Sequence, residues 1–119
     1  MKIAVTSQNF RTVTGHGGKS RRFLIFDATR GSTPSEVARL DLPKELSFHE
    51  FHGDGPHPVD GVDAIITGSC GSGFARRLAG RGIRVAITEM EDPLAAARAY
   101  VDGELPPVDP ETMAEHHHH

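Results

Sequence analysis

The chain has 119 residues, a net charge of −3 and one cysteine, Cys70. This length suits a single compact domain, and the lone cysteine excludes an internal disulfide and zinc sites built on paired cysteines. No apolar run approaches the roughly 18 residues that a membrane span needs, and an acidic chain without a basic, aromatic stripe argues against nucleic acid. We therefore expect a soluble cytoplasmic protein that has neither membrane nor nucleic acid as a partner.

The charges are distributed unevenly along the chain. Residues 2–26 contain no acid, whereas residues 89–115 contain eight acids and one basic residue, Arg98. Local positive potential attracts anions more than net charge does, so this pattern indicates that an anion binds near the N-terminal segment. Ordinary solvated surface charges are the alternative. The N-terminal basic residues are Lys2, Arg11, Lys19, Arg21 and Arg22.

The first half of the chain predicts three strands. Apolar runs favour strands at 3–5, 22–27 and 36–42, with a loop over 7–20. Gly31 and Pro34 suit a hairpin connection between the second and third strands. Three early strands joined in this way indicate antiparallel pairing.

The second half predicts an alternation of strands and helices. Residues 43–61 hold too many glycines and prolines for a long helix, and strands are expected at 62–67 and 83–87 with a short amphipathic helix at 74–78 between them. Asp92 is a good N-cap for a helix that starts at Pro93 and stops before Gly103. We expect parallel pairing through the strand–helix–strand unit, hence a mixed five-stranded α/β sheet.

The chain ends in two segments outside the predicted domain, which covers residues 1–105. Residues 106–115 are rich in proline and poor in apolar residues, and we expect a flexible tail there. Residues 116–119 are four consecutive histidines, which have the pattern of a purification tag.

The segment TGHGGKSRR, Thr14 to Arg22, is the first candidate site. Glycines expose backbone N–H groups to an anion, the three cations Lys19, Arg21 and Arg22 add charge, and an imidazole offers a metal ligand or a hydrogen bond. The spacing does not match a P-loop, and a plain glycine-rich turn is the alternative. The candidate binding residues are Gly15, His16, Gly17, Gly18, Lys19 and Arg21.

The segment GSCGSG, Gly68 to Gly73, is the second candidate site. It lies between a predicted strand and a predicted helix, where ligands collect in α/β sheets, and it contributes Gly68, Ser69 and Gly71 as candidates. A tight turn with Ser72 as N-cap is the alternative, and the spacing does not fit a nicotinamide cofactor. The thiol of Cys70 would be acidified near a helix start and could bind a soft metal, although a lone cysteine also suits inert packing.

The segment FHEFHGDGPHP, Phe48 to Pro58, holds His49, His52 and His57. Three imidazoles brought together by a turn-rich loop could hold zinc or iron. The HEFH spacing is one residue shorter than the HExxH zinc motif. A histidine-rich surface loop without a ligand is the alternative.

Several segments together resemble the dinitrogenase iron–molybdenum cofactor biosynthesis family, the domain of NifX and NafY and of the C-terminal part of NifB. They are the opening MKIAVTS, then GHGGKSRRFLIFD, GVDAIITGSCGSG, and LAGRGIRVAI leading to AYVDGEL. The resemblance runs from Met1 to about Leu105. It departs from the family pattern at Gly17, where a phenylalanine is typical, and at 43–61, where relatives have a helix before the fourth strand.

The resemblance implies a ribonuclease H-like fold and a carrier rather than an enzyme. It implies that the chain binds an iron–sulfur or iron–molybdenum–sulfur cluster, or a precursor, in nitrogenase cofactor assembly or related trafficking, with assembly or nitrogenase-type proteins as partners. His16 matches the family's first-loop histidine and is the leading expected ligand, followed by His49, His52, His57 and Cys70. The alternatives are a small metal-dependent enzyme using the three loop histidines, and a partner-binding domain without metal.

Overall fold

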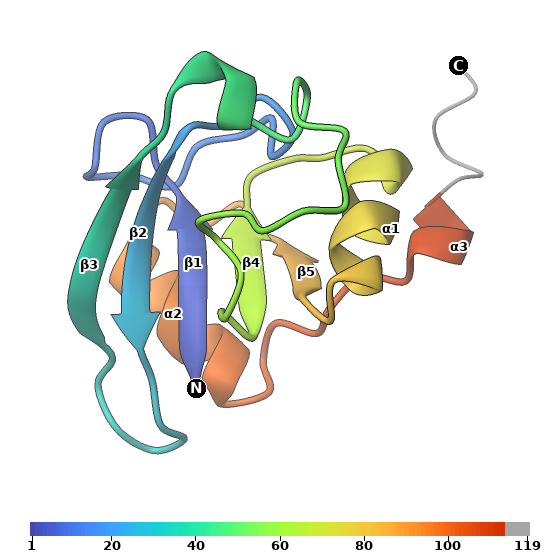
Figure 1. Ribbon diagram of the computed structural model, residues 1–119. Helices are drawn as coiled ribbons and strands as arrows, with labels where there is room; N and C mark the ends of the chain where they lie inside the picture. Colours follow the sequence, from blue (N-terminus) through green and yellow to red (C-terminus); the bar gives the residue numbers. More distant parts are fainter. Residues whose placement is uncertain (114–119) are drawn as a thin grey trace.

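The computed structural model describes residues 1–113 and contains one mixed five-stranded sheet (Figure 1). Its strands lie in the order β3-β2-β1-β4-β5. The expected tag at 116–119 and residues 114–115 of the expected tail lie outside the described residues. The strand bounds are β1 Lys2–Thr6, β2 Arg22–Asp27, β3 Ser35–Asp41, β4 Ala64–Thr67 and β5 Arg84–Ile87.

The pairing confirms the mixed sheet expected from the sequence. β1 runs antiparallel to β2, and β2 antiparallel to β3, whereas β1, β4 and β5 run parallel. Val5 in the middle of the sheet faces Leu24 on one side and Ile66 on the other. The antiparallel half comes from hairpin-type connections, and the parallel half from the strand–helix–strand unit.

One helix covers each face of the sheet. α1, Ser72–Gly80, packs on the face that includes Ala4, and α2, Pro93–Val101, packs on the face that includes Ile3 and Val5 (Figure 1). Because both faces are covered, the central strands are apolar throughout rather than alternating. Among the described residues, no helix is long and apolar enough to cross a membrane.

α2 begins and ends where the sequence places local signals. The Asp92 carboxylate accepts the Leu94 N–H at 3.1 Å, Pro93 fills the first turn, and Gly103 follows the helix with φ 82°. α1 is longer than the expected 74–78. Its N-cap is Gly71, not Ser72, which the alternative interpretation of the GSCGSG segment had placed there.

The segment from residue 43 to residue 61 forms a broad loop, as the sequence predicts. Its one helical element is the short 3₁₀ helix η1, Lys44–Leu46. Two arginines, Arg77 in α1 and Arg81 directly after it, hold the loop in place. Arg77 donates to the carbonyls of Phe48 and Phe51, and Arg81 pairs with Asp60 at 2.8 Å. These arginines therefore anchor the loop to the end of the molecule that carries α1.

The C-terminal segment differs from the flexible tail expected at 106–115. The Val108 N–H donates to the Val85 carbonyl of edge strand β5 at 2.8 Å. A last short helix, α3 Pro110–Met113, buries Met113 in the same core cluster as α1. Prolines at 106, 107 and 110 do not prevent this, because an extended segment needs few N–H groups to pair with an edge strand.

Candidate functional site

The candidate site lies where three loops meet at the carboxyl ends of β1 and β4 (Figure 1). These two strands are adjacent and parallel, but the chain leaves β1 toward β2 and leaves β4 toward β5 on the other side. Such a reversal of direction opens a crevice at the strand ends, where α/β proteins bind ligands. The loops are residues 7–21, 42–63 and 68–71.

Direct hydrogen bonds join the two glycine motifs into one structure. The His16 N–H donates to Ser69 Oγ at 2.9 Å, and the Gly17 N–H donates to the Ser69 carbonyl at 2.8 Å. The Gly68 N–H donates to the Thr14 carbonyl at 2.9 Å. Residues that are more than 50 positions apart in sequence therefore form one surface.

Close approach explains two of the glycines. A Cβ at Gly17 would lie 2.8 Å from the ring of Phe74, and a Cβ at Gly68 would lie 3.2 Å from the backbone of Gly15. Both distances are shorter than normal carbon contacts. The two loops can pack against each other and against α1 because side chains are missing at these positions.

His16 has an unusual backbone conformation at the centre of this junction. Its φ is 59°, in the left-handed region that residues other than glycine seldom occupy. Its carbonyl accepts the N–H groups of Lys19 and Ser20, which closes the turn, while its side chain remains exposed. A strained conformation held by its neighbours is typical of functional positions.

A hollow of about 300 Å³ opens beside this turn. All the residues that line it are candidates from the sequence analysis. Gly15 and Gly68 lie at the junction of the two loops instead, and Arg21 lines a different hollow. The lining residues are His16, Gly17, Gly18, Lys19, Ser69, Cys70 and Gly71.

The wall formed by Gly71 is the N-terminus of α1. Glycine has no side chain to accept the first helical N–H groups, so these donors stay available. The helix dipole adds partial positive charge at this end, and the Lys19 ammonium lines the same hollow. The arrangement favours an anion with several acceptor atoms.

The position of Cys70 near a helix start suggested a thiol with a lowered pKa, but the structure indicates the opposite. Burial raises the pKa of this thiol to about 11, because the charged thiolate is poorly solvated there. Its side chain packs partly against the core that contains Phe74. At neutral pH it is therefore a neutral thiol.

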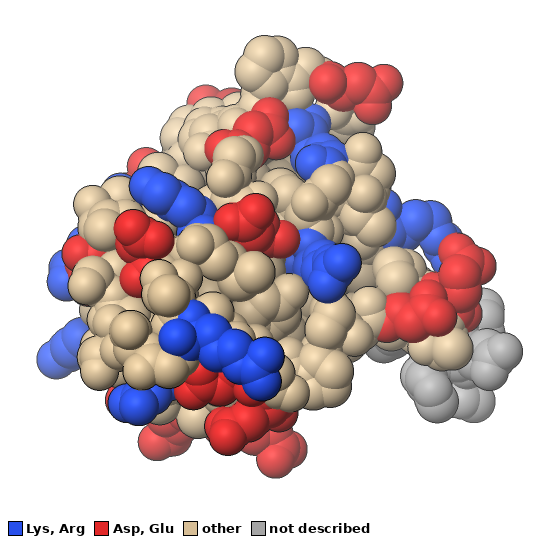
Figure 2. All heavy atoms as spheres, turned by 90° about the horizontal axis from the view of Figure 1, so that it is seen from below, with Lys and Arg blue, Asp and Glu red and all other residues tan. Residues whose placement is uncertain are grey.

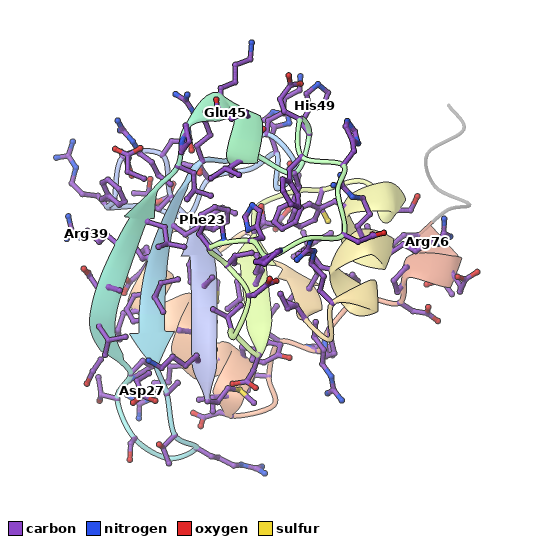
Figure 3. All side chains as sticks on the ribbon, in the orientation of Figure 1. Phe23, Asp27, Arg39, Glu45, His49 and Arg76 are labelled. Atoms are coloured by element: carbon purple, nitrogen blue, oxygen red, sulfur yellow. The ribbon has the colours of Figure 1, made fainter. Side chains whose placement is uncertain are left out.

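His49 and His52 border the glycine loops from the other side. The His49 N–H donates to the Gly18 carbonyl at 2.6 Å, and both imidazoles are exposed. They line a second hollow of about 600 Å³ that shares Gly18 and Gly71 with the first. Figure 3 labels His49 at the end of the molecule where these loops meet.

His57 is separated from the other histidines by burial. Its Nδ1 accepts the Val59 N–H at 3.1 Å and its Nε2–H donates to the Leu46 carbonyl at 2.6 Å. The ring stacks on Phe48 with centroids 4.3 Å apart, and burial lowers the pKa of the imidazole. Both nitrogens are used inside the loop, so His57 supports the loop structurally.

The three histidines of this loop therefore do not come together in the structure. Within residues 1–113, no three histidine, cysteine or acidic side chains converge in a way that could hold a metal ion. The physical reason is Phe48: its burial draws His57 into the core, while His49 and His52 stay in solvent.

Two threonines support the site and were missed by the sequence analysis. Thr6 Oγ1 donates to the Thr14 carbonyl at 2.6 Å and lies 3.0 Å from Thr67 Oγ1. Both threonines are fully buried at the ends of β1 and β4. Hydroxyl residues ending two adjacent strands were the signal that could have revealed them.

The two ends of the sheet differ in charge distribution. The site end brings together Lys19, Arg21 and Lys44 around one hollow. Figure 2 shows the opposite end, where acidic and basic side chains are interspersed and neither sign dominates that face. The face drawn in Figure 2 therefore does not share the grouping of cations found around the site hollow.

Comparison with known proteins agrees with this fold. A "putative dinitrogenase" of Methanocaldococcus jannaschii has a TM-score of 0.61 and 16% identity, covering 92% of this chain and 95% of that chain. The protein PH0822 has a TM-score of 0.61 and 20% identity, covering 93% of this chain and 98% of that one. A "putative NifB protein" of Thermotoga has a TM-score of 0.56 and 17% identity, covering 89% and 91%.

At such identities these likenesses show the fold alone. No curated protein gives a significant match. The family model described as "Dinitrogenase iron-molybdenum cofactor" matches residues 1–103, which is nearly all of the described chain. The chain therefore belongs to the dinitrogenase iron–molybdenum cofactor family.

Proposed function

We propose that this protein binds and carries an iron–sulfur or iron–molybdenum–sulfur cluster, or a precursor of one. Its setting is nitrogenase cofactor assembly or related metal-cluster trafficking in the cytoplasm, with donor and acceptor proteins as partners. The observation that carries the proposal is the joined glycine loops, which surround a hollow with an exposed imidazole, backbone N–H donors and a lysine. Family membership supports the same cargo class.

The residues around the hollow would share the work of holding the cargo. The His16 imidazole would ligate one metal of the cluster, since a single neutral nitrogen gives a bond that can be exchanged. The N–H groups at the start of α1 and Lys19 would donate to the anionic sulfides. His49 and His52 would supply a second ligand from the adjoining hollow.

Cys70 is the weaker ligand candidate. Its thiol must lose a proton to bind a metal, and burial opposes that loss. His57 takes no part, because both of its ring nitrogens are hydrogen-bonded within the loop. A cargo held mainly by hydrogen bonds and one or two imidazoles can be released, which suits a carrier rather than an enzyme.

The strand arrangement also supports a ribonuclease H-like designation, which we propose for the fold. Its supporting features are the order β3-β2-β1-β4-β5 and the single strand, β2, that runs against the others.

Anaerobic reconstitution of tag-free protein tests the proposal. The protein is incubated with iron and sulfide, or with isolated iron–molybdenum cofactor, and bound metal and visible absorbance are measured after desalting. The key variant is His16→Asn, because asparagine tolerates the left-handed φ of 59° and removes the imidazole without distorting the turn.

We expect the unmodified protein to retain cluster and the variant to lose most of it. His16→Gln is a second variant that keeps side-chain size but imposes the usual strain at this φ. Equal cluster retention by the unmodified protein and His16→Asn would count against His16 as a ligand. Failure of every form to retain any cluster would overturn the proposed function.

A further inference from the structure

A second, strongly basic hollow adjoins the proposed cluster site. Its volume is about 460 Å³, and it is lined by Lys19, Arg21, Lys44, Ser47, His49 and Glu50. Lys19 also lines the hollow beside His16, and His49 also lines the hollow beside His52. The basic hollow is thus continuous with the surface through which cargo would enter and leave.

The cations of this hollow come from separate parts of the chain. Lys19 and Arg21 lie in the β1–β2 loop, and Lys44 lies in η1. All three side chains are exposed, and none of them forms an ion pair with another residue in the 1–113 range. The one acid in the lining, Glu50, is 3.7 Å from His49 Nε2 instead.

What distinguishes these cations is that they share one hollow. Arg22 pairs with Asp41, Arg39 with Glu36, and Arg81 with Asp60, while the other cations without an ion pair in the described range, such as Lys2 and Arg30, lie outside this hollow. Three like charges held near each other repel, and nothing in the fold described above requires them for packing. Their shared position therefore indicates recognition of an external anion.

We propose that Lys19, Arg21 and Lys44, here called the basic rim, are the docking surface for an acidic segment of the protein that delivers or receives the cargo. The inference rests on the proposed function, because a partner that exchanges cargo with the hollow beside His16 must cover this face. Glu and Asp side chains of the partner would pair with the rim, and Arg21 can bind a carboxylate in bidentate fashion. Such charge pairing sets orientation and speeds encounter.

The rim can be tested without any cluster, with a fluorescent peptide of eight glutamates as the probe. Binding to tag-free protein is measured by anisotropy at low salt and again near 0.5 M salt. The test variant is Arg21→Glu with Lys44→Glu. The control is Lys2→Glu with Arg30→Glu, which changes net charge equally at exposed positions outside the basic hollow.

We expect the rim variant to bind the peptide about tenfold more weakly than the control variant at low salt. The difference should shrink at high salt, where screening acts within a few ångströms. A neutral pair, Arg21→Gln with Lys44→Gln, should give an intermediate loss. Thermal melting should show both Glu variants to be folded, because the four side chains are exposed.

Three results would overturn the inference. They are no peptide binding by the unmodified protein at low salt, equal binding by the rim and control variants, and tighter binding of a single-stranded oligonucleotide of equal charge. Lys44→Glu alone should keep full cluster retention in the reconstitution assay. A protein that retains cluster but fails the peptide test would disprove the rim and leave the cluster proposal intact. A protein that binds the peptide at the rim but retains no cluster would overturn the proposed function, and with it the assignment of the rim to a cargo-exchanging partner.

Discussion

Gly17→Ala probes the close contact between the glycine loop that follows β1 and the Phe74 ring of α1. A methyl group there would lie 2.8, 3.0 and 3.2 Å from three atoms of the Phe74 ring, whereas carbon atoms normally approach to about 3.5–4.0 Å. The ring cannot easily move away, because Phe74 is buried and packs edge-on against Phe48 with centroids 5.7 Å apart. Overpacking of this kind costs about 1–3 kcal/mol, and the lower entropy of the unfolded alanine chain offsets about 0.4–1 kcal/mol.

The expected net loss of stability for Gly17→Ala is therefore about 1–2 kcal/mol, a fall in Tm of roughly 4–8 °C for a chain of this size. Gly18→Ala is the matched control, because its nearest neighbour, Phe74 Cδ1, would be at an ordinary 3.9 Å. It should be neutral or slightly stabilising. Urea and thermal unfolding followed by circular dichroism measure both variants.

A double-mutant cycle separates this clash from other effects. Phe74→Leu shortens the facing side chain, so Gly17→Ala should cost less in that background than in the unmodified protein. Equal stability losses for the two alanine variants would refute the reasoning. An equally large loss of stability for Gly17→Ala in the Phe74→Leu background would refute it as well.

Three further predictions concern the loop and the thiol. Burial lowers the pKa of His57, so the imidazole binds a proton less readily in the folded state than in the unfolded state. The contribution of His57 to the free energy of unfolding is therefore complete above the pKa of the unfolded state, about 6.5, and declines as pH falls below that value. His57→Gln should flatten the pH dependence of Tm between about pH 5 and 7, whereas His49→Gln, at an exposed position, should leave that dependence unchanged. If Tm of His57→Gln kept the same slope with pH, the buried, low-pKa state of His57 would be contradicted. Burial raises the pKa of the Cys70 thiol to about 11. Iodoacetamide should therefore modify Cys70 in the folded protein at pH 7.5 about a hundredfold more slowly than in the protein unfolded in urea. Equal modification rates would show that the thiol is acidified or exposed. The Arg77 guanidinium donates to two loop carbonyls, whereas the lysine ammonium of Arg77→Lys is a single donor group that cannot reach both in the same way. Hydrogen exchange of the amides of residues 47–61 should therefore accelerate by roughly tenfold. Arg76→Lys, on the same helix, should not change these exchange rates.

Local signals in the sequence account for much of the fold. The bounds of β2 and α2 follow directly from an apolar run at 22–27 and from the Asp92 cap with Pro93. The mixed pairing followed from the order of elements, because hairpins give antiparallel neighbours and crossovers give parallel ones. The meeting of the two glycine motifs follows in turn from the adjacency of β1 and β4.

Long-range contacts account for what the sequence analysis missed. Whether His57 joins the other histidines depends on its stacking with Phe48 and its bond to the Leu46 carbonyl, 11 residues away. The role of Arg77 depends on carbonyls 26 and 29 positions earlier. The packing of Val108 depends on an open edge at β5. None of these partners is marked by spacing or composition.

Mapping a bound cluster on the protein tests the central proposal most directly. A paramagnetic cluster broadens the amide signals of nearby residues, so spectra of labelled, tag-free protein can be compared before and after loading. We predict loss of signals from residues 15–19 and 68–71, with weaker effects at His49 and His52, and unchanged signals from the hairpin at residues 28–34. Broadening centred on any other part of the chain, or none in protein that holds cluster by metal analysis, would contradict the site.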